Sequence, residues 1–167
     1  MRWKNCATPI SRVCRMLNSD FKEFAQLLNA YEVDYLVVGG YALAAHGHPR
    51  YTGDLDIWYR NTHDNRVRVV SALEAFGFGA LGLTEDDLGD PGNVIQLGYP
   101  PRRIDLLGDI DGVSFSDCWP RRETIEWNGL ALPLISLGDF KANKRATGRL
   151  KDLADLEALG DRDASST

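Results

Sequence analysis

The chain has 167 residues, of which 44% are hydrophobic and 26% are charged, and its formal net charge is −5. This length and apolar content fit one domain with its own core, and the negative charge argues against a protein that coats nucleic acid or membranes. The three cysteines form no C-x-x-C pair, and no apolar run approaches the roughly 18 residues that a membrane span needs. We expect a cytoplasmic protein with no membrane partner.

The two ends of the chain differ in pattern from its centre. Residues 1–15 are basic, contain a proline and show no clear period, whereas a helical pattern begins just after Met16. We predict that residues 1–15 are a peripheral extension and that Met16 is the natural start. Residues 16–160 would then form the domain, and residues 161–167 a flexible tail.

The first half of the chain predicts helix, strand, helix and strand in that order. Apolar residues at helical spacing indicate a helix that is capped by Ser19 or Asp20. The run YLVV at 35–38 predicts a short buried strand, which stops at a glycine pair, and a short helix begins directly after it. DLDIWYR at 54–60 alternates as a half-buried strand, with both aspartates and Trp58 on one face.

The second half predicts one further helix, three strands and a helical end. Ser136 and Asp139 have the spacing of a capping box that opens the helical end. The order of elements predicts an α+β (mixed α/β) protein, a small mixed sheet flanked by helices with a C-terminal helical segment. The helix is expected at 64–76, and the strands at 94–98, 102–108 and around 130–134.

Asp54 and Asp56 form a D-x-D pair on one strand. Side chains at i and i+2 point the same way, about 6–7 Å apart along the backbone. Two carboxylates at this spacing suit a pair of divalent cations, and Mg²⁺ prefers such oxygen ligands. The alternative is a solvent-facing strand with ordinary surface acids.

A third carboxylate, Asp105, lies in the run RIDLL, where its two apolar neighbours are expected to face the core. If this strand neighbours the D-x-D strand, three carboxylates converge, and their repulsion is costly without cations. The alternative for Asp105 is an ion pair with Arg102 or Arg103.

Gly39 and Gly40 stand between the first strand and the helix that follows. Without a Cβ, they allow backbone N–H groups to approach an anion, and a helix start favours phosphate. Alone, the pair is equally a tight turn. Arg50 and Thr52, just before the D-x-D strand, are expected to contact a nucleotide, although Arg50 also fits a surface charge.

Two further patterns, an H-x-H pair and a G-x-G-x-x-G run, do not predict a binding site of the kind with which they are usually associated. His46 and His48 form an H-x-H pair, but without a third nearby ligand we expect loop hydrogen bonds or phosphate contacts there rather than a metal site. The run GFGALG at 77–82 matches G-x-G-x-x-G but follows a helix, so it is not a dinucleotide fingerprint. A P-loop motif is also missing from the sequence.

The pattern V-V-G-G-Y-A-L…H-G…R-Y-T-G-D-L-D-I resembles the nucleotidyltransferase-fold superfamily of polymerase-beta type, which joins a Gly-Gly or Gly-Ser turn to a D-x-D and a later Asp. Within it the chain is similar to small bacterial minimal nucleotidyltransferases and to AbiEii-type toxins. The run K-R-A-T-G-R-L-K-D-L-A-D-L-E-A-L at 144–159 is similar to a helical motif of the latter. Together these similarities span residues 16–160.

The resemblance implies a nucleotidyltransferase fold and a site with three kinds of residue. Gly39 and Gly40 would hold the triphosphate, and two Mg²⁺ ions, or Mn²⁺ in their place, would be bound by three aspartates. The metal set is Asp54, Asp56 and Asp105, the candidate phosphate contacts are Lys144, Arg149 and Lys151, and the residues that support them are Asp152 and Asp155.

The last segment also has a simpler interpretation, an amphipathic helix with Leu150, Leu153, Leu156 and Leu159 inward. In a continuous helix, Lys144 and Asp155 would lie on one face. This holds only if Gly148, which lies between them, does not break the helix.

The leading hypothesis is a magnesium-dependent enzyme that transfers a nucleoside monophosphate from an NTP to a hydroxyl of an RNA end, a protein or a small molecule. A role as a toxin with a cognate antitoxin is the favoured setting. The alternatives are a non-catalytic module that binds nucleotide or a partner on the same fold, and a kinase-like phosphotransferase.

Overall fold

The computed structural model describes residues 18–127 and 129–161. The predicted extension at 1–15, the predicted start at Met16 and nearly all of the predicted tail at 161–167 lie outside the described residues. Within the described ranges, no helix has the length and apolar character needed to cross a membrane.

Six strands of the described chain form one mixed sheet in the order β3-β4-β2-β1-β6-β5. β2 runs parallel to β4, and β1 runs parallel to β6, whereas the other neighbours are antiparallel. The predicted mixed sheet is confirmed. The strands are β1 (Tyr35–Val38), β2 (Asp54–Tyr59), β3 (Val94–Leu97), β4 (Arg103–Leu107), β5 (Glu123–Trp127) and β6 (Leu130–Leu134).

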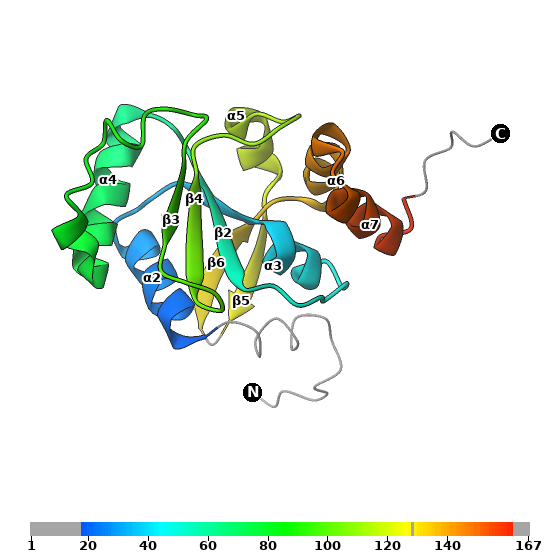
Figure 1. Ribbon diagram of the computed structural model, residues 1–167, viewed down its shortest axis with the longest axis horizontal. Helices are drawn as coiled ribbons and strands as arrows, with labels where there is room; N and C mark the ends of the chain where they lie inside the picture. Colours follow the sequence, from blue (N-terminus) through cyan, green and yellow to red (C-terminus); the bar gives the residue numbers. More distant parts are fainter. Residues whose placement is uncertain (1–17, 128, 162–167) are drawn as a thin grey trace.

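The helices flank this sheet on two sides. Figure 1 shows α2 and α4 together on one side of the strands, and α6 and α7 as a separate pair on the other, beyond α3. The cap of α2 is Asn18, whose side chain accepts a hydrogen bond from the Phe21 backbone N–H at 2.9 Å, and not Ser19 or Asp20 as predicted. The helices are α2 (Ser19–Ala30), α3 (Gly39–Ala45), α4 (His63–Leu73), α5 (Phe115–Cys118), α6 (Leu137–Thr147) and α7 (Leu150–Ala158).

The core lies at the centre of the sheet, where β1 is buried along its whole length. Strand β2 shows the predicted alternation, except that Trp58, on the face of the two aspartates, is fully buried. The reason is α5, because the ring of Phe115 packs edge-on against Trp58 with centroids 5.0 Å apart. The open face of β2 is therefore confined to its start, where its two aspartates lie.

The C-terminal segment is two helices, α6 and α7. Gly148 ends α6 with φ +61, a left-handed conformation that glycine adopts without strain, and α7 begins two residues later. Leu150 is 88% exposed and Leu153 41% exposed, whereas Asp152 and Asp155 are buried. The interpretation of this segment as a helix with these two leucines inward is wrong, since its inner face carries the carboxylates.

Candidate functional site

Three carboxylates and one guanidinium form a block on the open face of β2 and β4. The two strands are parallel, with Asp54 opposite Arg103 and Asp56 opposite Asp105. Because alternate residues of a strand point to the same face, all four side chains share one surface. The condition set by the sequence, that the RIDLL strand should neighbour the D-x-D strand, is met.

Arg103 joins two of the carboxylates. Its Nη2 lies 2.7 Å from Asp54 Oδ2 and 3.1 Å from Asp105 Oδ2, and its Nε lies 2.9 Å from Asp105 Oδ1. The contact between Nε and Oδ1 is an ion pair without hydrogen-bond geometry. Three buried atoms therefore have no hydrogen-bond partner, namely Arg103 Nε, Asp105 Oδ1 and Asp54 Oδ1. One guanidinium thus leaves two buried carboxylate oxygens unsatisfied.

Asp56 has no ion pair within the described part of the chain. Burial, followed by repulsion from Asp105 and Asp54, raises its pKa from 3.8 to about 7, although two lysines partly oppose this. Burial also raises the pKa of Asp105, against the hydrogen bond and charge of Arg103. Across the described ranges, no three acidic, histidine or cysteine side chains are arranged as a ready metal site, and here Arg103 lies between two of the three.

The glycine pair directly adjoins these carboxylates. β1 and β2 pair with Val38 opposite Asp56, so the turn after β1 falls beside the D-x-D segment. Gly39 has φ +65, and a Cβ added to it would lie 2.1 Å from Asp56 Oδ2; at Gly40 an added Cβ would lie 2.9 Å from Thr52 Cβ. Both positions therefore exclude a side chain.

A cleft of about 700 Å³ opens over this block, a volume within the range of small-molecule sites. Its walls are the glycine turn, the start of β2, parts of β3 and β4, the loop at 109–111 and the ends of α6 and α7. Of the candidates, the cleft is lined by Gly39, Gly40, Arg50, Thr52, Asp54, Asp56, Asp105, Lys144, Arg149, Lys151 and Asp152.

Two of the predicted nucleotide contacts are already held by carboxylates. Lys144 Nζ is buried 2.6 Å from Asp152 Oδ1 and 3.4 Å from Asp155 Oδ2. Arg50 binds Asp155 through Nε at 2.8 Å and Nη2 at 3.0 Å, so it ties α7 to the loop before β2. The break at Gly148, rather than one continuous helix, folds α7 back so that its aspartates reach Lys144.

Arg149 and Lys151 differ from this pair, because they line the cleft without an ion pair in the described part of the chain. Both side chains belong to exposed residues. They are the lysine and arginine of the α6–α7 hinge that remain available to an anion in the cleft.

The H-x-H pair lies away from this arrangement. His46 Nε2 lies 2.9 Å from the Ile135 carbonyl oxygen, and its side chain is 6% exposed. His46 thus makes a hydrogen bond, as expected, but to a residue 89 positions away and not within its own loop. His48 makes no side-chain hydrogen bond in the described chain.

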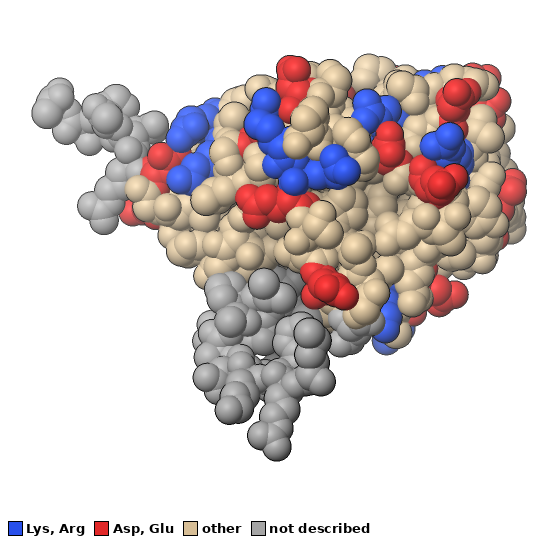
Figure 2. Space-filling model, turned by 180° about the vertical axis from the view of Figure 1, so that it is seen from behind, with Lys and Arg blue, Asp and Glu red and all other residues tan. Residues whose placement is uncertain are grey.

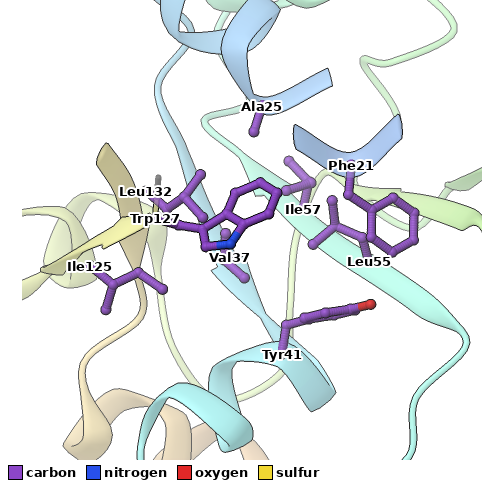
Figure 3. Close-up of a pocket in the computed structure, with 9 residues that line it drawn as sticks. All are labelled: Phe21, Ala25, Val37, Tyr41, Leu55, Ile57, Ile125, Trp127 and Leu132. Atoms are coloured by element: carbon purple, nitrogen blue, oxygen red, sulfur yellow. The ribbon is translucent and has the colours of Figure 1, made fainter. Parts of the chain in front are cut away.

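A second concave region has a different character. Figure 3 shows a small gap lined by nine side chains, with the rings of Phe21, Tyr41 and Trp127 around it. Its volume of about 10 Å³ admits one water molecule at most, and its lining is almost entirely apolar. This small apolar gap under α2 lacks the polar groups of the carboxylate cleft and is not a candidate site.

Figure 2 shows the face opposite to that of Figure 1, where basic and acidic side chains are interspersed along the upper half. Ion pairs join basic and acidic side chains in the described chain, as between Arg121 and Asp139 at 2.8 Å and between Arg60 and Asp34 at 2.8 Å.

One member of the site was not predicted in its role. The sequence indicated Arg103 only as a possible ion-pair partner of Asp105, in place of a metal role for that residue. In the structure it bridges Asp105 to Asp54. The signal was the R-x-D spacing on one strand, which puts a guanidinium and a carboxylate on the same face.

Two solved structures are similar to the chain. A protein from Thermotoga maritima, whose assignment as a nucleotidyltransferase is itself a prediction, superposes with a TM-score of 0.53 and 16% identity, over 84% of this chain and 91% of the other. An antigenic nucleotidyltransferase-like protein from Paracoccidioides brasiliensis has a TM-score of 0.49 and 18% identity, over 92% of this chain and 74% of the other. No model of a protein family and no curated protein matches the sequence at a significant level. The first likeness shows that the chain has the nucleotidyltransferase fold that its sequence resembles.

Proposed function

We propose that the protein is a nucleotidyltransferase that moves a nucleoside monophosphate from an NTP to a hydroxyl of an acceptor. The observation that carries this proposal is the contact between the glycine turn and the D-x-D pair, since Gly39 leaves no room for a Cβ beside Asp56. A phosphate-binding turn and a set of metal-binding carboxylates at one cleft are what such a reaction needs.

The residues present suit Mg²⁺. Among the described residues, Asp54 Oδ1 and Asp105 Oδ1 are buried without hydrogen-bond partners and Asp56 forms no ion pair, so the block offers hard oxygen ligands on three side chains. Asp54, Asp56 and Asp105 would hold two Mg²⁺ ions, or Mn²⁺ in their place. When bound, such ions lower the pKa of an attacking hydroxyl and neutralise charge on the leaving pyrophosphate.

The other cleft residues have distinct parts in this proposal. The backbone N–H groups of Gly39 and Gly40 bind the triphosphate, and Arg149 and Lys151 contact it from the hinge between α6 and α7. Lys144 and Arg50, held by buried aspartates, keep the hinge in place. A bond forms between the acceptor oxygen and the α-phosphorus, the α–β phosphoanhydride bond breaks, and the acceptor proton passes to solvent.

The acceptor in this proposal is an RNA end, a protein side chain or a small molecule. The setting as a cytoplasmic toxin with a cognate antitoxin is proposed from the similarity of the sequence to minimal nucleotidyltransferases and AbiEii-type toxins. The negative net charge gives no support to an RNA acceptor over the other two.

One observation favours a second candidate, a non-catalytic binding module on the same fold. Arg103 already forms ion pairs with Asp54 and Asp105, which is an arrangement that also stabilises a site without metal. This candidate predicts nucleotide binding without turnover and tolerance of Asp105→Asn.

Product analysis separates these functions. The protein is incubated with each α-labelled NTP, Mg²⁺ and cell extract, and the products are resolved by mass. A nucleotidyltransferase yields labelled acceptor and pyrophosphate, a kinase-like enzyme yields NDP, and a binding module yields neither. Failure to release pyrophosphate with any NTP and any acceptor fraction would remove the leading proposal.

A further inference from the structure

Arg103 is a basic residue in direct contact with the carboxylate block. Within the described chain, it is the one cationic side chain that forms an ion pair with Asp54 or Asp105. The side chain of Arg103 is 26% exposed, and those of Asp54 and Asp105 are 27% and 10% exposed. The ion pairs are thus partly shielded from water. A charge that loses its partner in such a shielded place is costly.

The guanidinium stands where a cation is expected. It bridges an aspartate of β2 to the aspartate of β4 that lies diagonally across from it. It carries one positive charge against three carboxylates and leaves two buried oxygens unsatisfied. A divalent cation would serve these oxygens better, but it would compete with Arg103 for Asp54 Oδ2 and Asp105 Oδ2.

The guanidinium also matches the incoming substrate. A guanidinium fork binds phosphate in the same two-point geometry as carboxylate, and Arg103 lines the cleft that the glycine turn shares. Among the basic side chains of the described chain that line this cleft, Arg103 is the one that forms an ion pair with the carboxylate block.

We infer that Arg103 is a positioning residue that holds the carboxylates in place without metal and yields them when an NTP takes its guanidinium. Metal and nucleotide then bind cooperatively: free Mg²⁺ binds weakly, and each ligand raises the affinity of the other by the same factor. This inference rests on the proposed function, because it assumes that the carboxylates are metal ligands.

Metal binding, rather than turnover, tests it. Mn²⁺ binding to the full chain is measured by calorimetry and by electron paramagnetic resonance, with and without a non-hydrolysable NTP analogue. The variants are wild type, Arg103→Met and the matched control Arg102→Met. Arg102 is adjacent, its side chain is 67% exposed and its ion pair with Asp20 spans 3.3 Å, so the control removes the same charge away from the carboxylates.

Without nucleotide, Arg103→Met is expected to bind Mn²⁺ about tenfold more tightly than wild type, and the gain that the analogue produces in wild type is expected to shrink by a similar factor. Arg102→Met should behave as wild type. Equal or weaker Mn²⁺ binding by folded Arg103→Met would overturn the inference.

Thermal melting shows whether Arg103→Met folds. If it does not, Arg103→Lys is the variant that tests the inference. An ammonium lacks the planar fork, so Arg103→Lys should bind Mn²⁺ more tightly than wild type but less than Arg103→Met. An unchanged affinity in Arg103→Lys contradicts the inference while leaving the metal site intact. If wild type and all variants bind no Mn²⁺ even with the analogue, the proposed metal role fails as well.

Discussion

Gly39 and Asp56 are in such close contact that a single methyl group on the glycine would lie 2.1 Å from the carboxylate oxygen Oδ2. The two residues are seventeen positions apart in the sequence, and the antiparallel pairing of Val38 with Asp56 brings them together. This contact makes the glycine turn and the D-x-D pair one site.

Gly39→Ala is expected to disrupt both the fold and the site. The substitution puts a side chain at φ +65 and against Asp56, and the backbone conformation alone costs about 1–2 kcal/mol. We expect a lower free energy of unfolding in urea and loss of nucleotide binding. Gly138→Ala is the matched control, since no atom lies within 4 Å of its added Cβ; equal effects at both positions would contradict this prediction.

Asp56 predicts a dependence of stability on pH in the absence of metal. Its pKa is raised from 3.8 to about 7 in the folded protein, so the folded state binds the proton more tightly than the unfolded state. The contribution of the protonated Asp56 carboxyl to the free energy of unfolding is complete below about pH 4, and it is lost as the pH rises through about 7. Asp56→Asn should therefore be the more stable protein at pH 8, by about 1–3 kcal/mol.

Urea unfolding between pH 4 and pH 8 tests this, with Glu126→Gln as a control that removes one exposed carboxylate. Saturating Mg²⁺ should flatten the wild-type profile, because a cation neutralises the carboxylate. A difference between Asp56→Asn and wild type that stays constant over this range would refute the assignment.

Lys144 and Lys151 line the same cleft but should respond differently to loss of charge. Lys144→Met leaves the buried Asp152 and Asp155 short of a counter-ion, and we expect a loss of about 3 kcal/mol in unfolding free energy. Lys151→Met, at an exposed residue without an ion pair in the described chain, should change stability by less than about 0.5 kcal/mol while weakening NTP binding. Thermal melts and nucleotide titrations separate the two, and a destabilised Lys151→Met would argue against its role as a phosphate contact.

The leucines of α7 provide a test of its orientation. Leu150 is 88% exposed and Leu156 is 4% exposed. Leu156→Ala should cost about 2–4 kcal/mol through the cavity that it leaves, whereas Leu150→Ala should stay within about 0.5 kcal/mol of wild type. If Leu150→Ala proves the more destabilising of the two, α7 packs by another face.

Local signals in the sequence were sufficient to predict most strands of the sheet and two parts of the site, the D-x-D strand and the glycine turn. Alternation predicts the strand that holds Asp54 and Asp56, and a buried run that stops at two glycines predicts the strand and turn before Gly39, because both patterns depend only on neighbouring residues. Strand β5 was not predicted, since its residues ETIEW are largely exposed and carry little apolar alternation.

The relationships between distant residues needed the three-dimensional fold. Arg103 meets Asp54 across forty-nine positions because β4 lies beside β2 in the sheet order, which no local period encodes. Lys144 meets Asp155 because Gly148 reverses the chain. A glycine in a helical pattern is compatible with a continuous helix or with a break; here the helix ends at Gly148, and Arg50 holds the second helix through Asp155.

The central claim is that the carboxylates of β2 serve a pyrophosphate-releasing transfer. The most direct measurement is pyrophosphate release and label transfer from α-labelled NTPs by wild type and by Asp54→Ala with Asp56→Ala, under saturating Mg²⁺. We predict a loss of about 100-fold or more in the double variant, with the fold retained by circular dichroism. Unchanged transfer by the folded double variant would contradict it.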